Sequence, residues 1–283
     1  MKLTHHPWEI TATGPLAVIA GCNVLESEDE ALTVGRHLKS VCADLELPYC
    51  FKASFDKANR SSIKSFRGPG MKEGLQLLKH IKDELNVPIC SDLHELSQAD
   101  AVAEVVDIIQ IPAFLCRQTD LVVAATKAAQ KHGAILHVKK AQFLAPWDCK
   151  NIISKIREVD ADAKILLCER GSSFGYNNLV VDPLAISEMK KLGVLTTIDA
   201  THAVQLPGAN PLTGGASTGG RRDGVPLIAK ACVAAGADGV FLEFHTEPDA
   251  ALCDGPSCLP LEAAEPLLRD LKAIRKIVAI DST

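Results

Sequence analysis

Eight short apolar runs, each followed by a longer amphipathic stretch, are the feature of this 283-residue sequence that most restricts its fold. The runs occupy residues 16–21, 48–53, 87–92, 107–111, 134–140, 164–169, 194–200 and 239–244. Nearly all of their residues are apolar, as expected for parallel strands that are covered on both faces. The runs therefore predict a buried parallel sheet.

Helices are predicted in the gaps between the runs, at 28–45, 72–85, 97–105, 118–131, 150–159, 183–192, 224–235 and 261–280. Ser27 precedes the first of them as an N-cap candidate. Eight strand–helix units in succession predict a closed (β/α)8 barrel, the TIM-barrel fold. A doubly wound open sheet is the alternative, but such sheets usually have fewer strands, and no G-x-G-x-x-G follows the first run.

Residues 1–15 precede the first unit as an N-terminal extension. They contain the alternating segment WEITAT, for which we expect a short hairpin that closes the barrel floor. No linker or fixed-period repeat interrupts the chain, so residues 1–283 are expected to form a single domain. The loop 207–220 is rich in Gly, Pro, Ser and Thr and is predicted to be mobile in the absence of ligand.

Composition argues against several classes of partner. Lys plus Arg number 30 and Asp plus Glu 35, and a net charge of −5 disfavours nucleic acid or an anionic membrane as the main partner. No run of 18 apolar residues predicts a membrane span, and the first residues lack the apolar core of a secretion signal. Ten cysteines without a C-x-x-C pair indicate reduced thiols of a cytoplasmic protein.

Polar side chains follow every apolar run, at the end where a barrel carries its active site. They are Asn23, Glu26, Lys52, Lys57, Asp92, His94, Gln110, Arg117, Lys139, Lys140, Glu169, Arg170, Asp199, His202, Glu243 and His245. Any one of them is explained by the polar start of a loop, but their recurrence at all eight ends predicts a site.

Cations are frequent in this set and in the segment FKASFDKANRSS (51–62). Those expected to line one mouth are Lys52, Lys57, Arg60, Arg67, Arg117, Lys139, Lys140 and Arg170. Because such a ring would repel itself without a counter-charge, it predicts one or two strongly anionic substrates. The alternative is a solvated loop with surface ion pairs such as Asp56–Arg60.

A second group has the chemistry of metal ligands. His202, Glu243 and Asp254 could converge, with Asp92 or His94 nearby. At the end of the first run stands Asn23, beside Cys22. Because an Asn amide is a poor ligand for a transition metal, the alternative is that the group forms a hydrogen-bond network around a water.

Long motifs resemble the 3-deoxy-D-manno-octulosonate 8-phosphate synthases, over residues 17–272. They are FKASFDKANRSS, SFRGPG (65–70), IIQIPAFLCRQTDL (108–121), VKKAQF (138–143), ERGSSFGYNNLVVD (169–182), DATHAVQLPG (199–208) and CDGPS (253–257). The resemblance implies a transferase of lipopolysaccharide biosynthesis, which condenses phosphoenolpyruvate with D-arabinose 5-phosphate and water. It also implies a homotetramer.

The resemblance further implies roles for individual residues. Lys57, Lys139 and Arg170 would hold phosphoenolpyruvate, Gln110 and Arg117 would support them, and Lys52 would lie near the carboxylate. Asn59, Arg60 and Ser61 would bind the sugar phosphate. The catalytic candidates are Asn23, Lys57, Lys139, His202 and Asp254, and the further substrate-binding candidates are Asp92, His94 and Glu243.

The family has two branches, which differ at the end of the first strand. One binds a divalent metal through the Cys of an AGPC motif, and the other has Asn there and needs no metal. This chain reads AGCNVLES, with Asn23 at the ligand position, and CDGPS also resembles the metal-free branch, whereas QFLAPWD (142–148) resembles the metal-dependent one. We therefore expect no metal cofactor; if a divalent metal were bound, His202, Glu243 and Asp254 would be its ligands.

Two other activities stay open on the sequence. A related synthase condenses phosphoenolpyruvate with erythrose 4-phosphate on the same barrel. A class I aldolase would instead use a Schiff-base lysine such as Lys139.

Overall fold

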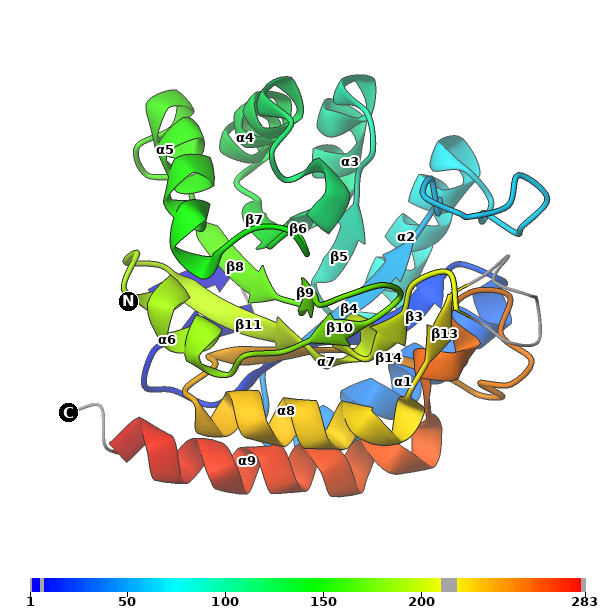
Figure 1. The fold of residues 1–283 in the computed structure, drawn as a ribbon. Helices are drawn as coiled ribbons and strands as arrows, with labels where there is room; N and C mark the ends of the chain where they lie inside the picture. Colours follow the sequence, from blue (N-terminus) through cyan, green and yellow to red (C-terminus); the bar gives the residue numbers. More distant parts are fainter. Residues whose placement is uncertain (1, 6–7, 210–217, 281–283) are drawn as a thin grey trace.

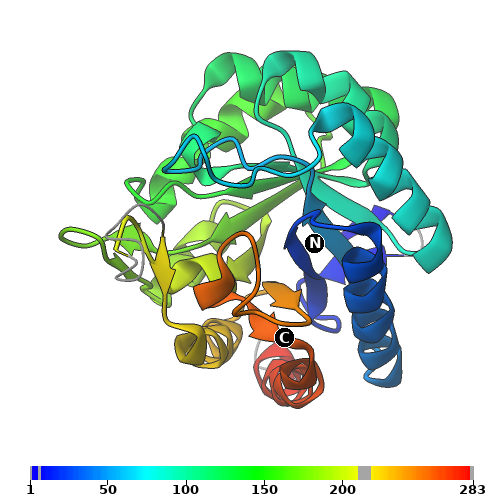
Figure 2. The same cartoon turned by 90° about the vertical axis from the view of Figure 1, so that its right-hand side faces the viewer.

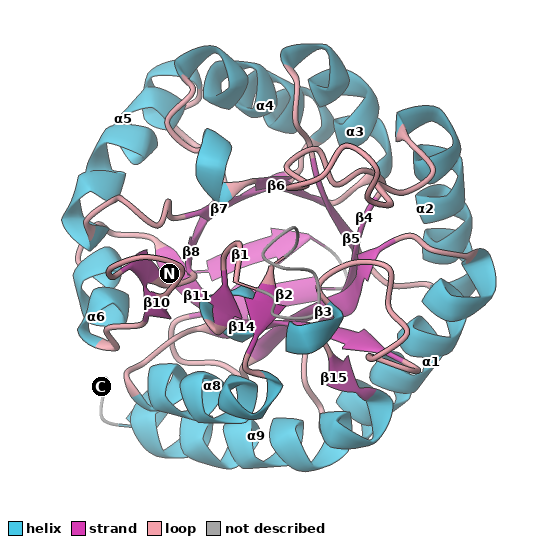
Figure 3. Cartoon of the chain, turned by 45° about the vertical axis from the view of Figure 1, so that its right-hand side comes forward, coloured by secondary structure: helices cyan, strands magenta, loops and turns pink. Residues whose placement is uncertain are grey.

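Eight parallel strands close into a barrel at the centre of the molecule (Figure 3). The computed structural model describes residues 2–5, 8–209 and 218–280. The barrel strands are β3 (Ala17–Val24), β4 (Tyr49–Ser54), β5 (Ile89–Asp92), β6 (Ile108–Ile111), β7 (Ile135–Lys139), β8 (Ile165–Glu169), β11 (Leu195–Asp199) and β14 (Gly239–His245). Each pairs with its neighbours, and β11 pairs with β14 to complete the ring. The predicted TIM barrel is therefore confirmed, and the open-sheet alternative is wrong.

One helix follows each barrel strand and packs outside it (Figure 1). These helices are α1 (Glu28–Asp44), α2 (Met71–Leu85), α3 (Ala99–Val105), α4 (Thr119–His132), α5 (Cys149–Val159), α6 (Leu184–Lys190), α8 (Val225–Ala234) and α9 (Ala264–Ile280). Ser27 caps α1 as predicted, because its hydroxyl accepts a hydrogen bond from Glu30 N at 3.1 Å. The helix ring closes where α9 contacts α1 (Figure 2).

The predicted hairpin closes the barrel floor. It consists of β1 (Lys2–His5) and β2 (Trp8–Thr11), which pair antiparallel. Trp8 and Ile10 are buried in one apolar cluster with inward-facing residues of the barrel strands. Arg275 of α9 holds the segment that follows, because its guanidinium donates to the carbonyls of Ala12 and Gly14. Apolar side chains thus fill the lower barrel, which leaves the carboxyl ends of the strands for polar groups.

Short strands and one short helix lie at the carboxyl ends of the barrel strands. They are β9 (Ser172–Ser173) with β10 (Leu179–Val180), α7 (Ala200–Ala203), β12 (Gln205–Leu206) with β13 (Gly219–Gly220), and β15 (Leu259–Pro260) on β14. The pair β12–β13 forms the stem of the Gly-rich loop, and most of the loop predicted to be mobile, residues 210–217, lies outside the described residues.

A close approach of two strands shapes the site end of the barrel. A Cβ atom on Gly21 of β3 would lie only 2.2 Å from the carbonyl oxygen of Lys52 on β4. Glycine is therefore required at this position for the two strands to pair.

Within the described part of the chain, no helix combines the length and the apolar character needed to cross a bilayer.

Candidate active site

A cavity of about 410 Å³ opens at the carboxyl ends of the barrel strands. Loops after seven of the eight strands contribute to its wall. The predicted site residues that line it are Lys52, Lys57, Asn59, Arg60, Ser61, Asp92, His94, Gln110, Lys139, Arg170, His202 and Asp254. Asn23 and Glu243 lie directly against this set, whereas Arg117 lies apart from it.

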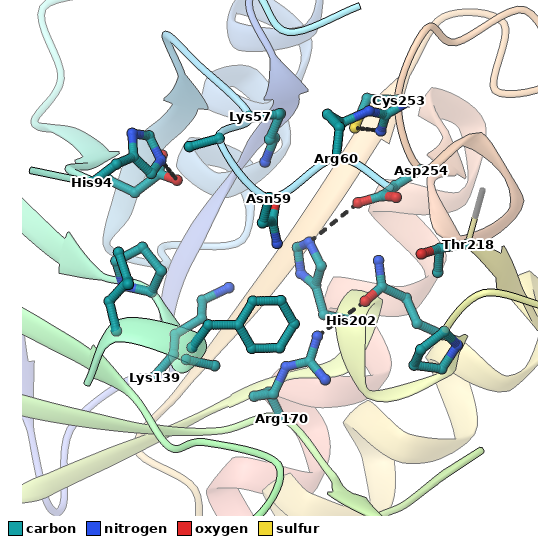
Figure 4. Close-up of a pocket in the computed structure, with 18 of the residues that line it drawn as sticks. Lys57, Asn59, Arg60, His94, Lys139, Arg170, His202, Thr218, Cys253 and Asp254 are labelled. Carbon is teal, nitrogen blue, oxygen red and sulfur yellow. Dashed lines mark hydrogen bonds and ion pairs between the residues drawn. The ribbon is translucent and has the colours of Figure 1, made fainter. Parts of the chain in front are cut away.

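Three nearly buried cations converge on the cavity from separate parts of the chain (Figure 4). Lys57, Lys139 and Arg170 are 9%, 5% and 6% exposed. Lys139 is ion-paired with Asp199, and Arg170 Nη2 donates to Gln205 Oε1 at 3.0 Å. Arg170 Nη1 is buried without a hydrogen-bond partner among the described residues. Buried charges are costly unless they are paired, so this cluster is arranged to receive an anion.

Lys140 does not point into the cavity, so its predicted place in the ring of cations is wrong. Successive residues of a strand face opposite sides, and Lys139 takes the inner side. Lys140 Nζ instead donates to Leu144 O at 3.1 Å and to Ser172 Oγ at 3.0 Å. It also lies 3.5 Å from a carboxylate oxygen of Glu169, in the layer between the barrel and the helices.

Two predicted arginines also lie outside the cavity lining. Arg67 forms a two-point ion pair with Asp56, at 2.8 and 2.5 Å, so Asp56 pairs with Arg67 rather than with Arg60. Arg117 is exposed on the loop before α4, where its carbonyl accepts a hydrogen bond from Lys155. In a single chain, Arg117 is therefore not part of the cavity lining. Among the described residues, no contact supports its predicted role in binding an anion.

The loop between β4 and α2 forms one rim of the cavity. Asn59 and Ser61 are exposed on this rim, and Arg60 donates to the Leu252 carbonyl at 3.3 Å and to Cys253 Sγ. Arg60 therefore ties the rim to the loop after β14. The exposed side chains of Asn59 and Ser61 place an amide and a hydroxyl group at the entrance.

The opposite wall offers hydrogen-bond acceptors. His94 Nε2 lies 3.0 Å from Asp92 Oδ2. Burial opposes ionisation of Asp92, but His94 and Lys57 outweigh it and hold the pKa of this carboxyl well below its usual range. Asp92 Oδ1 and Gln110 Oε1 are both buried without a partner among the described residues. Orphaned acceptors of this kind suit the hydroxyl groups of a polyol.

Lys52 lies at the base of the cavity with no exposed surface. Its ammonium donates to Glu243 Oε1 at 2.7 Å and to the Asn23 carbonyl at 3.0 Å. Burial lowers the pKa of Lys52, but Glu243 more than reverses this and leaves it above the usual value. Burial likewise opposes ionisation of Glu243, and His202 with Lys52 holds its pKa well below the usual range. The pair therefore stays charged.

The metal-like residues converge, but Asn23 is hydrogen-bonded to two of them. Its Nδ2 donates to Glu243 Oε2 at 2.5 Å and to Asp254 Oδ2 at 3.2 Å. His202 Nε2 lies 3.5 and 3.8 Å from the same two carboxylate oxygens, and its Nδ1 lies 2.8 Å from Asp199 Oδ2. Among the described residues, no three His, Cys, Asp or Glu side chains have the arrangement of a metal site.

Cys22 does not compete with Asn23 for this position. Strand alternation turns Cys22 into the apolar cluster under the helices, where it is 2% exposed. Burial raises the pKa of its thiol, so the thiolate that a metal requires is disfavoured.

Several residues of the cavity were not predicted from the sequence. They are Gln142, Gln205, Thr218 and Cys253, together with the segment Pro112–Leu115. Gln205 follows His202 by three residues within a motif that the resemblance already used. Phe241 was not predicted either; it precedes Glu243 by two residues and so shares the inner face of β14 with it.

Replacement of Gln205 by Leu should weaken the binding of inorganic phosphate as a probe anion, because Arg170 would lose the acceptor that orients it. Hydrogen bonds to charged groups contribute about 1.5–3 kcal/mol, so we expect a loss of affinity of roughly tenfold or more. Isothermal titration calorimetry measures it. Gln76→Leu, on the exposed face of α2, is the control, and equal affinities of the two variants would contradict a role for the Arg170–Gln205 bond.

Comparison with known proteins identifies the family. The family model for the DAHP synthetase I family matches residues 9–279. A 2-dehydro-3-deoxyphosphooctonate aldolase of Citrifermentans bemidjiense is 52% identical over 264 residues, which are 93% of this chain and 93% of the relative. The protein of the same name from Shewanella denitrificans is 52% identical over 270 residues, or 95% of this chain and 91% of the relative.

A third relative agrees with these two. The 2-dehydro-3-deoxyphosphooctonate aldolase of Geobacter metallireducens is 50% identical over 264 residues, or 93% of this chain and 94% of the relative. That name is a synonym of the synthase that the sequence motifs resemble. On these matches, the chain belongs to the DAHP synthetase I family, in the group of the 3-deoxy-D-manno-octulosonate 8-phosphate synthases.

Proposed function

We propose that this protein condenses phosphoenolpyruvate with D-arabinose 5-phosphate and water to give 3-deoxy-D-manno-octulosonate 8-phosphate and inorganic phosphate. The observation that carries the proposal is the convergence of Lys57, Lys139 and Arg170 in one cavity. Two phosphorylated substrates offer acceptors to these nearly buried cations, including the Nη1 atom of Arg170, which has no partner among the described residues. The orphaned acceptors of Asp92 and Gln110 suit the hydroxyl groups of the open-chain sugar.

The chemistry requires two polyanions to be held with their reacting carbons in contact. C3 of phosphoenolpyruvate attacks the aldehyde carbon, whose oxygen takes up a proton as the new carbon–carbon bond forms. Water then adds to C2 and loses a proton, which gives a hemiketal phosphate. The bond between C2 and the phosphate oxygen then breaks as the C2 hydroxyl gives up its proton, which leaves the ketone and inorganic phosphate. Positioning and preorganised positive charge lower the barrier to the first step.

We assign the phosphoenolpyruvate end of the cavity to Lys57, Lys139 and Arg170. The sugar phosphate belongs at the rim, with Asn59, Arg60 and Ser61. The proton for the new alcohol comes from Lys57, Lys139 or a water held by Asn23, His202 and Asp254. These groups surround the same space, so all three routes are within the geometry.

The class I aldolase alternative fits the site less well. A Schiff base forms from a neutral amine, whereas Lys139 is ion-paired with Asp199. The erythrose 4-phosphate alternative is disfavoured by the name that the curated relatives share.

Release of inorganic phosphate from phosphoenolpyruvate tests the reaction. We expect release with D-arabinose 5-phosphate and much slower release with erythrose 4-phosphate, because the shorter sugar cannot span from the reacting carbon to the rim. A coupled phosphate assay measures both rates. Borohydride treatment in the presence of either substrate is the control and should leave the enzyme active. Release of phosphate from phosphoenolpyruvate with erythrose 4-phosphate but not with D-arabinose 5-phosphate would contradict the proposal. Inactivation by borohydride would contradict it too.

We further propose that the reaction needs no metal. The support is the amide of Asn23, which donates hydrogen bonds to the carboxylates of Glu243 and Asp254 and so takes the place of a ligand. Because an Asn amide is a poor ligand for a transition metal, the four residues do not fit such an ion as they stand.

Dialysis against a strong chelator should leave turnover unchanged. Asn23→Cys should bind Zn²⁺ or Mn²⁺ more tightly than the wild-type protein, because a thiolate would then join His202, Glu243 and Asp254. Calorimetric metal titration measures this affinity independently of activity. Cys22→Ala is the control and should bind metal as the wild type does, since Cys22 faces the helices. Loss of wild-type activity on dialysis, restored by metal, would contradict metal independence.

We propose a homotetramer in the cytoplasm. All ten cysteines are free thiols, which agrees with a reducing compartment. Large apolar side chains are exposed on the loops after the neighbouring strands β6, β7 and β8, where a subunit contact would cover them. They are Phe114, Phe143, Trp147, Phe174 and Tyr176.

Phe143→Asp should dissociate this assembly, because it would place a charge in the apolar contact. Light scattering after size exclusion should give four times the 30.2 kDa chain mass for the wild type and a smaller multiple for the variant. Ile277→Asp, an exposed position on α9, is the matched control and should not change the mass. A wild-type monomer would contradict the assembly.

A further inference from the structure

Among the described residues, Phe241 is the aromatic ring over which two buried lysines of the site, Lys52 and Lys139, both lie. It lies on the inner face of β14 with no exposed surface, at the top of the apolar cluster that fills the barrel floor. Lys139 Nζ lies 3.5 Å from the ring centroid, and Lys52 Nζ lies 5.3 Å from it. Both distances are within the range of about 6 Å in which a ring face attracts a cation.

Each lysine also has a carboxylate on another side. Lys139 is paired with Asp199, whose Oδ2 is shared with His202 Nδ1. Lys52 is paired with Glu243. A carboxylate neutralises an ammonium as it fixes it, whereas an aromatic ring orients the ammonium through its quadrupole and adds no net charge. The ring can therefore hold a lysine in place and leave its positive charge available to a substrate anion.

Two histidine rings also neighbour Phe241. His202 packs against it at 5.9 Å between centroids and His137 at 6.2 Å. Burial and the nearby charge of Lys139 lower the pKa of His137 to about 3, so this ring is neutral at physiological pH. His137 Nε2 is 3.0 Å from Thr197 Oγ1, which fixes it below Phe241.

We propose that Phe241 is a positioning residue, whose π face sets where the ammonium of Lys139, and more weakly that of Lys52, stands in the cavity. The inference rests on the proposed function, in which Lys139 binds phosphoenolpyruvate. Without the ring face, the ammonium of Lys139 would be positioned by Asp199 alone. Its charge would then be less available to the phosphate group of the substrate. A ring that served packing alone would need its shape but not its electron distribution.

Fluorination of the ring separates these two roles. Site-specific replacement of Phe241 by mono-, di- and trifluorophenylalanine weakens the negative ring face in steps and changes its volume little. We expect kcat/KM for phosphoenolpyruvate to fall in the same order, by about 3- to 30-fold over the series, with the larger part in KM. The thermal midpoint should stay nearly constant.

Phe244 provides the matched control. It lies on the same strand and is also fully buried, but strand geometry places it in the cluster under the helices. The same fluorinated residues at Phe244 should leave kcat/KM unchanged. Phe241→Leu should lower kcat/KM at least as much as the trifluoro residue, whereas Phe244→Leu should lower mainly the thermal midpoint.

An unchanged kcat/KM across the Phe241 series, or an equal loss in the Phe244 series, would overturn the role of the ring. Absence of phosphate release by the wild-type protein would overturn the proposed function instead. In that case the affinity of the same series for inorganic phosphate, measured by calorimetry, would still decide whether the ring face positions an anion-binding lysine.

Discussion

Pairing of charges inside the barrel is the constraint on which the site depends. Lys139 on β7 meets Asp199 on β11, and Lys52 on β4 meets Glu243 on β14. In each pair exactly one barrel strand lies between the two partners, β8 in the first and β3 in the second. Inward side chains of alternate strands share a layer in an eight-stranded barrel, so closure of the sheet itself brings the partners together. An open sheet of the same strands would leave the second pair without this geometry.

The apolar floor of the barrel lies directly below this polar layer and sets its surroundings. Trp8 and Ile10 of the hairpin and Phe241 of β14 fill the barrel below the charges and exclude water. Electrostatic attraction is stronger in such surroundings, and unpaired charge is also more costly there. Among the described residues, Arg170 Nη1 has no hydrogen-bond partner in this layer, so it can donate a hydrogen bond to an anion in the cavity.

The fold and most of the site followed from the sequence, because strand and helix periods are local properties. Strand ends pointed to Lys57 and Arg170 without knowledge of any contact. The pair Lys139–Lys140 exposed the limit of this reasoning, since a run of two lysines does not say which one faces inward. Phe241 was missed for the opposite reason: an apolar residue in an apolar strand carries no local sign that cations will lie over it. The bond between Gln205 and Arg170 joins two loops, and no spacing in the sequence encodes it.

Two carboxylates at the end of the barrel need a group between them that compensates their charge. Glu243 and Asp254 both accept from the amide of Asn23, and both lie near His202. A neutral amide donates two hydrogen bonds but brings no charge, so it leaves the compensation to Lys52, which is paired with Glu243. A metal ion at the same point would supply that charge by itself. The choice of Asn at position 23 therefore leaves the two carboxylates held by this amide and by Lys52, with the His202 ring beside them, rather than by a bound ion.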